Sequence, residues 1–296
     1  MRTSTVAALI SSLIVLAFCA GCTTSTTPSY SVDNNGILSV TCAPVTTSET
    51  VLFSNDTYTE SKLILHTQTG DVVTYLSYPK QPKAVLLYLP GAGEQITGHE
   101  GRMVQYAADG YAFMFLDYRG RGGETAGYPL NPNTDFALFE NKEWPEYYLT
   151  ICDISSARAL LASRFGVPIY AVGGSNGGRY AAVAAGVDKN FAGYIGISTA
   201  DWGIKEQAIA QGGSGDVIRF ATSLEPSTYL PTISPRPVWM FHNATDPIIS
   251  FADGEALFAT ANEPKNFTIF NGGHGINPDV DNLLMGRLAQ IYGTPT

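Results

Sequence analysis

The chain has few charged residues for its length, and basic residues are fewer than acidic ones. Charged residues make up 15% of its 296 residues, and 26 acidic side chains outnumber 17 basic ones, for a net charge of −9. An acidic surface repels nucleic-acid phosphates and anionic lipids. Because no basic patch with interleaved aromatic residues occurs, we do not expect nucleic acid to be a partner.

Sequence patterns that hold metal ions or nucleotides are also missing. No HxH or HExxH pair of metal ligands occurs. The chain has no phosphate-binding P-loop and no GxGxxG motif followed by an acidic residue. The sequence therefore predicts a protein that uses neither a metal ion nor another cofactor.

The N-terminus has the features of an export signal. Arg2 precedes a mostly apolar run over residues 6–20, which ends in Ala20-Gly21-Cys22. The run is shorter than the roughly 20 residues that span a membrane. The segment resembles a lipoprotein signal peptide, which implies cleavage after residue 21 and acylation of Cys22. We therefore expect an exported protein held at the cell surface by a lipid on Cys22, with cleavage by an ordinary signal peptidase and secretion as the alternative.

Residues 22–31 are rich in serine and threonine and lack an apolar period, which is typical of a tether. The predicted domain then covers residues 32–296. Cysteine is scarce: of four in the chain, Cys42 and Cys152 lie in this domain. In an export compartment these two could form a disulfide, and the alternative is two buried thiols.

The remaining chain is rich in apolar residues, at 45%, and long enough to bury one large core. Residues 62–66 and 72–77 predict a β-hairpin, and the continuous apolar run 84–89 predicts a strand buried on both faces. From there strands and helices alternate, which indicates a doubly wound, mostly parallel sheet with an antiparallel N-terminal edge. Strands are expected at residues 84–89, 112–116, 169–172, 192–197, 238–242 and 266–270, and helices at 99–108, 145–164, 176–185, 252–261 and 280–292.

Residues 201–236 interrupt this alternation with several glycines and prolines. We interpret this segment as an irregular insertion that lies over the active site as a short lid, outside the core. Its aromatic residues Trp202, Phe220 and Tyr229 are candidates for a substrate pocket, although aromatic side chains in such a segment more often serve packing.

One candidate nucleophile stands out. Gly173-x-Ser175-x-Gly177 lies directly between a predicted strand and a predicted helix. A tight strand-to-helix turn exposes the serine hydroxyl, and the flanking glycines let the backbones pass closely. The start of the helix beside it also favours negative charge. The pattern therefore indicates a nucleophilic serine at Ser175.

A candidate base and acid follow later strands in the order Ser, Asp, His. His274 comes after the strand at 266–270, and Asp246 comes after the strand at 238–242. A serine needs an adjacent base, and that base needs a carboxylate to orient it. We favour Asp246 as this acid, with Asp201 as the alternative because it also follows a strand. His66, His99 and His242 are expected to have structural roles.

These residues resemble the α/β-hydrolase superfamily, particularly its dienelactone-hydrolase-like, acetyl-xylan-esterase-like and prolyl-oligopeptidase-like branches. The loops 90–93 (PGAG) and 116–122 (LDYRGRG) match as well. The resemblance implies the α/β-hydrolase fold, the triad Ser175, His274 and Asp246, and an oxyanion hole formed by the backbone amides of Ala92 and Asn176. Where the superfamily often has histidine this chain has Pro90, and its nucleophile is serine where dienelactone hydrolases use cysteine.

The function that the resemblance implies is hydrolysis of a small-molecule carboxylic ester without a cofactor. Prolyl-oligopeptidase-like peptidases share these residues but normally carry a large N-terminal β-propeller, whereas only residues 32–57 precede the hydrolase pattern here. A serine peptidase is thus the first alternative, and a non-catalytic surface binding protein is the second. The sequence does not indicate an oligomeric state.

Overall fold

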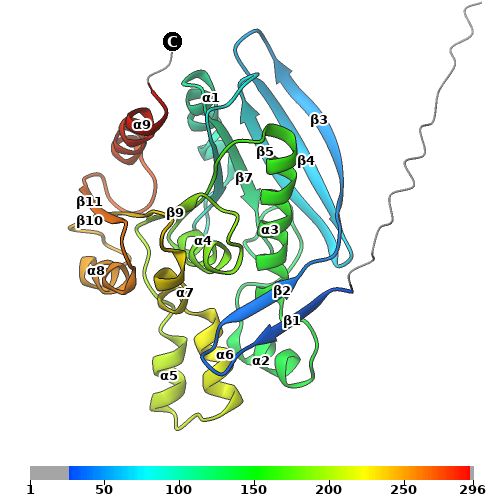
Figure 1. Ribbon diagram of the computed structural model, residues 1–296, viewed down its shortest axis with the longest axis vertical. Coiled ribbons are helices and arrows are strands. Elements are labelled where there is room, and N and C mark those ends of the chain that lie inside the picture. The colour runs from blue at the N-terminus through cyan, green and yellow to red at the C-terminus, as the bar shows by residue number, and fades with distance from the viewer. Residues whose placement is uncertain (1–26, 294–296) are drawn as a thin grey trace, which may run out of the picture.

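The computed structural model describes residues 27–293, which form a nine-stranded mixed sheet with helices on both faces and a separate two-stranded sheet (Figure 1). The strand order of the large sheet is β11-β10-β9-β8-β6-β7-β5-β4-β3. Its parallel strands are β6 (Val85–Leu89), β7 (Ala112–Asp117), β8 (Ile169–Gly174), β9 (Gly193–Ile197), β10 (Val238–Asn243) and β11 (Lys265–Phe270). The antiparallel strands are β3 (Thr46–Ser54), β4 (Thr59–Thr67) and β5 (Gly70–Tyr78), of which β5 pairs with β7.

This topology confirms the predicted mostly parallel, doubly wound sheet with its antiparallel edge. The strands and helices that we expected from residues 62–197 and 238–292 are all present. Strand β6 explains why its sequence is apolar throughout: Leu87 packs into the core on one face, and Leu86 and Tyr88 pack into the core on the other.

The helices divide between these two faces. The first face carries α3 (Glu146–Phe165), α4 (Asn176–Val187), α7 (Pro226–Ile233) and α8 (Phe251–Thr260), and the second carries α1 (Glu100–Ala108) and α9 (Pro278–Tyr292). Helix α2 (Pro132–Glu140), which we did not predict, begins with Asn131 as its N-cap and Pro132 in its first turn.

The N-terminal boundary of the domain lies earlier than predicted. Residues Ser29–Val32 form strand β1, which pairs with β2 (Leu38–Thr41), so the last part of the predicted tether 22–31 belongs to the folded domain. The reason is Tyr30, whose ring packs against those of Trp144 and Tyr148 at centroid distances of 5.1 Å each. The predicted signal peptide 1–21 and Cys22 lie outside the described residues.

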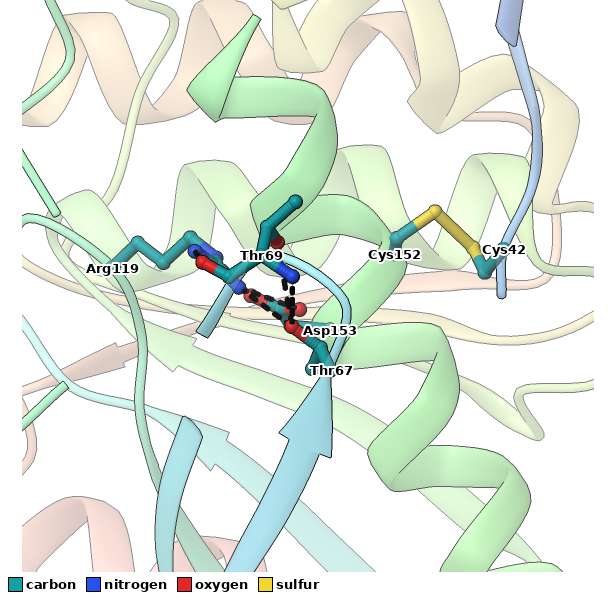
Figure 2. The surroundings of a disulfide bond; sticks show 6 residues. All are labelled: Cys42, Thr67, Thr69, Arg119, Cys152 and Asp153. Carbon is teal, nitrogen blue, oxygen red and sulfur yellow. Dashed lines mark hydrogen bonds and ion pairs between the residues drawn. A yellow bond between two sulfur atoms is a disulfide. The ribbon is translucent and has the colours of Figure 1, made fainter. Parts of the chain in front are cut away.

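A disulfide joins Cys42, which follows β2, to Cys152 on α3 (Figure 2). It links positions 110 residues apart in the sequence and so holds the N-terminal extension against the first face of the domain. Beside it, Asp153 accepts a hydrogen bond from Arg119 Nε at 2.6 Å. Of the two states that the sequence left open for these cysteines, the structure has the disulfide.

The prediction that residues 201–236 stay outside the core is wrong. They form α5 (Ile204–Ala210), α6 (Asp216–Leu224) and α7, and α7 packs against α4. Leu230 and Ile233 of α7 are fully buried. The prolines that we interpreted as irregular structure include Pro226, which begins α7. Of the three helices, only α5 has no buried residue.

Within the described residues 27–293, no helix is both long and apolar enough to cross a membrane.

Candidate active site

Ser175 occupies the tight turn between β8 and α4, with φ 50° and ψ −121°. A positive φ strains any residue that has a side chain. Two hydrogen bonds hold the turn: the Ser175 amide donates to Ile197 O at 2.9 Å, and the Thr199 hydroxyl donates to Ser175 O at 2.8 Å. The end of β9 therefore fixes the conformation of the candidate nucleophile.

The two flanking glycines are required by close backbone contacts. A Cβ atom on Gly177 would lie 2.0 Å from Leu89 O, and one on Gly173 would lie 2.3 Å from the backbone of Gly177. Neither position has room for a side chain. These contacts bring the start of α4 against the end of β6, as the sequence pattern predicted.

The structure pairs His274 with Asp246, and not with Asp201. His274 Nδ1 lies 2.9 Å from both carboxylate oxygens of Asp246, whose side chain is fully buried. Because an ionised carboxylate only accepts hydrogen bonds, Nδ1 carries the proton and Nε2 keeps its lone pair. The imidazole thus has the tautomer that a general base needs.

Asp246 is kept ionised by its surroundings. Its Oδ1 accepts hydrogen bonds from the backbone amides of Ile248 and Ile249 at 2.9 and 3.0 Å. Burial raises the pKa of this carboxyl, but these two amides and His274 more than offset that effect, so the pKa of Asp246 lies below its usual value. A negative charge therefore faces His274 Nδ1 at neutral pH.

Asp201 has a different role. Its carboxylate accepts a hydrogen bond from the Ser227 amide at 2.8 Å, at the start of α7. Burial raises the pKa of Asp201, although the hydrogen bonds from Ser227 act in the opposite direction. The side chain therefore anchors the insertion to the end of β9, which explains why it also follows a strand.

The predicted oxyanion-hole loop lies against the nucleophile. A Cβ atom on Gly91 would be 3.2 Å from Ser175 Cβ, which places the neighbouring Ala92 beside the serine. Asn176 is the first residue of α4, where backbone amides have no partner within the helix. Its side-chain oxygen accepts from Arg179 Nη1 at 2.8 Å. The loop that contains Ala92 and the first residue of α4, Asn176, thus lie next to Ser175.

The sequence analysis missed Glu94, whose carboxylate also reaches this site. Its Oε1 would lie 3.3 Å from a Cβ atom on Gly91 and 3.4 Å from one on Gly275, the residue after His274. Nothing in the sequence around Glu94 signals this position, because Gly275 is brought to it only by the fold.

The other candidate residues have mainly structural contacts. His66 bonds to Asp71 and Ser48 in the antiparallel part of the sheet. His242 is fully buried, and its Nε2 lies 3.0 Å from Ile249 O. His99, in contrast, contacts Glu94 and so adjoins the site.

The aromatic residues of the insertion pack within the protein. Trp202 stacks with the guanidinium of Arg179, Phe220 packs on Phe139, and the Tyr229 hydroxyl donates to a backbone oxygen. No cluster of three or more potential metal ligands occurs among residues 27–293.

These features define the class: the chain has the α/β-hydrolase fold, with a serine at the strand-to-helix turn and a paired histidine and aspartate on later loops. The comparisons with solved structures agree on this fold. An acetyl xylan esterase from Paenibacillus sp. R4 is similar with a TM-score of 0.66 at 18% sequence identity, over 84% of this chain and 89% of that one. Acetyl xylan esterase 1 from Thermoanaerobacterium sp. JW/SL YS485 has a TM-score of 0.64 at 13% identity, over 84% and 88%.

A glucuronoyl esterase from Solibacter usitatus is similar with a TM-score of 0.60 at 13% identity, over 88% of each chain. A scan against protein-family models found no match, and a search of curated proteins found none either.

The contact at Gly177 generates a stability prediction. Gly177→Ala should lower the free energy of unfolding by at least about 2 kcal/mol, because the new methyl group overlaps Leu89 O. Gly286→Ala is the matched control, since Gly286 is also helical but has no atom within 4 Å of its Cβ position. It should raise the same free energy by roughly 0.5–1 kcal/mol. Chemical denaturation followed by circular dichroism measures both, and equal stabilities for the two variants would contradict the close contact.

Proposed function

We propose that this protein hydrolyses carboxylic esters through an acyl-enzyme on Ser175. The observation that carries the proposal is the Asp246–His274 pair. Asp246 follows β10 and His274 follows β11, and the next strand of the sheet, β9, positions Ser175. The structures reported above, which have the same fold, are named as esterases.

The chemistry follows from the groups in place. His274 Nε2 takes the proton of Ser175 Oγ as that oxygen bonds to the ester carbonyl carbon, and the amides of Ala92 and Asn176 donate to the resulting oxyanion. Collapse breaks the bond to the alcohol, which leaves with the proton from His274. A water molecule then adds to the acyl-enzyme, gives its proton to His274, and the carboxylic acid departs as Ser175 Oγ regains that proton.

The chain's location is a separate proposal. We propose that it is exported and held at a membrane by acyl chains on Cys22, which lies outside the described residues. The Cys42–Cys152 disulfide supports export, because disulfides persist in oxidising compartments and are rare in the cytosol.

Mass spectrometry of the native protein tests this location. The mature chain should begin at an acylated Cys22, and Cys22→Ser should lack the lipid. A native chain that starts at another residue without lipid would remove the anchor and leave the proposed activity standing.

The proposed activity is tested by substrate class. The protein should cleave p-nitrophenyl esters of short acids and leave aminoacyl-p-nitroanilides intact, and a fluorophosphonate probe should label it at a single site. Ser175→Ala should abolish both turnover and labelling. Ser214→Ala, an exposed serine outside any strand-to-helix turn, should change neither. Anilide cleavage would favour the peptidase alternative, and neither turnover nor labelling would favour a binding protein.

The assignment of the acid is tested by two matched variants. Asp246→Asn should keep the fold but lower kcat by roughly 10⁴-fold, since an amide favours the wrong tautomer of His274. Asp201→Asn should lower kcat less than about tenfold, because Asp201 binds Ser227 and not His274. The measurement is kcat on one activated ester, with circular dichroism to confirm folding. The reverse order of effects would move the acid to Asp201.

A further inference from the structure

Glu94 lies where the loop after β6, the nucleophile turn and the histidine loop meet. Cβ atoms on Gly91, Gly174 and Gly275 would lie 3.3, 3.6 and 3.4 Å from its Oε1. The Gly91 position is also 3.2 Å from Ser175 Cβ, so Oε1 and Ser175 Cβ are separated by no more than the sum of 3.2 and 3.3 Å. Oε1 therefore lies close to the candidate nucleophile.

The other carboxylate oxygen holds the side chain in place. Oε2 accepts hydrogen bonds from the Tyr88 hydroxyl at 2.8 Å and from the Gly91 amide at 3.0 Å, and it lies 3.2 Å from His99 Nε2. Within residues 27–293, Oε1 accepts no hydrogen bond. One oxygen is thus used for positioning, and the other is left for a ligand.

The tautomer of His99 follows from its second contact. Arg102 Nη1 lies 2.9 Å from His99 Nδ1, and because a guanidinium only donates, Nδ1 must accept. The ring proton is then on Nε2 and points at Glu94 Oε2. Arg102 is itself bonded to Asp281 through its Nε at 2.8 Å. His99 is therefore a neutral donor, fixed in orientation by the Arg102–Asp281 pair.

Glu94 consequently brings a negative charge to the site. Burial raises the pKa of its carboxyl, but the hydrogen bonds from His99 and Tyr88, the electrostatic attraction of His99 and the hydrogen bond from the Gly91 amide more than compensate, so the pKa lies below its usual value. None of these three donors is a cation. The guanidinium of Arg121 binds Asp117 at 2.5 Å and donates to the backbone oxygen of Glu94, not to its carboxylate.

We propose that Glu94 is a specificity-determining residue: its free Oε1 accepts a hydrogen bond from a hydroxyl or ammonium group near the scissile ester and disfavours substrates that carry a negative charge there. The proposal rests on the proposed ester hydrolysis and adds a substrate class to it, namely esters with a hydrogen-bond donor beside the reacting carbonyl. A role limited to bracing the Gly91 loop would affect all substrates alike.

The experiment compares wild type with Glu94→Gln. The amide can keep its oxygen toward the three donors and turn its NH₂ group toward the site, so the side chain's position is retained and its charge is lost. In the first series the alcohol part varies: unsubstituted phenyl acetate is compared with phenyl acetates that carry a trimethylammonium or a carboxylate group. In the second series the acid part varies: p-nitrophenyl hemisuccinate, which is charged, is compared with p-nitrophenyl pentanoate, which is neutral. The measured quantity is kcat/KM relative to the neutral ester of each series, and comparing this ratio between variant and wild type cancels the intrinsic reactivity of the esters.

The variant should raise relative kcat/KM for the carboxylate-bearing ester about tenfold in at least one series, and in the alcohol series it should lower that of the trimethylammonium ester. Glu140→Gln is the matched control, because it removes the same charge from an exposed position at the end of α2 and should change each ratio less than twofold. Unchanged ratios in both series, or an equal loss on every ester, would overturn the proposal.

Two further outcomes are distinguishable. A wild-type protein without activity on any neutral ester would remove the proposed function and this inference with it. If Glu94→Gln does not fold, the salt dependence of the wild-type protein tests the proposal instead. Its relative kcat/KM for the carboxylate ester should increase about threefold or more between 0.01 and 0.5 M KCl, because salt screens the repulsion. A flat salt profile would overturn the proposal.

Discussion

The positive φ of Ser175 is the constraint on which the rest of the site depends. Such a conformation costs roughly 1–3 kcal/mol, so it persists only where surrounding contacts enforce it. Here the enforcing contacts come from the end of β9, through Ile197 O and the Thr199 hydroxyl, and from the contact of Gly177 with Leu89 O at the end of β6. The same contacts bring the loop at Gly91 against the serine. The strained turn, the flanking amides and the central strands are therefore one structural unit, and a change in any of them moves the nucleophile.

The remaining groups are positioned by hydrogen bonds within their own loops. Asp246 closes a short turn by accepting hydrogen bonds from the amides of Ile248 and Ile249, and these bonds fix its carboxylate independently of His274. His274 then takes its orientation from that carboxylate, in a loop where Gly273 and Gly275 have positive φ. Since β10 and β11 are parallel neighbours in register, both loops leave the same edge of the sheet. The position of the Asp246 carboxylate is thus set by its own turn, and the orientation of the His274 ring is set by that carboxylate.

The features that were predictable from sequence are those with a local signal. The run 84–89 is apolar at every position because both faces of β6 are buried, and the glycines around Ser175 mark a backbone contact. Tyr30 and the helices of residues 204–233 were misjudged because their partners are distant in sequence: Tyr30 packs on Trp144, and α7 packs on α4. The sequence favours Asp246 over Asp201, but both follow strands, and only the fold shows that Asp246 pairs with His274 and Asp201 with Ser227. Glu94 shows the same limit, as its contacts with His99 and Gly275 lie in other segments.

An ionised carboxylate beside an oxyanion hole raises a physical question that bears on the substrate. The amides of Ala92 and Asn176 would stabilise negative charge on the carbonyl oxygen, whereas Glu94 would oppose it, and neither effect is screened well in a partly buried site. The three donors on Oε2 compensate the desolvation of Glu94 but leave its charge in place. The conflict is relieved when a donor lies between Oε1 and the reacting carbonyl, because a hydroxyl or ammonium proton there interacts favourably with both oxygens. If Glu94 bound no such group, its charge would only slow the reaction. The presence of an anchored carboxylate at this position therefore favours substrates that bring their own hydrogen-bond donor to the site.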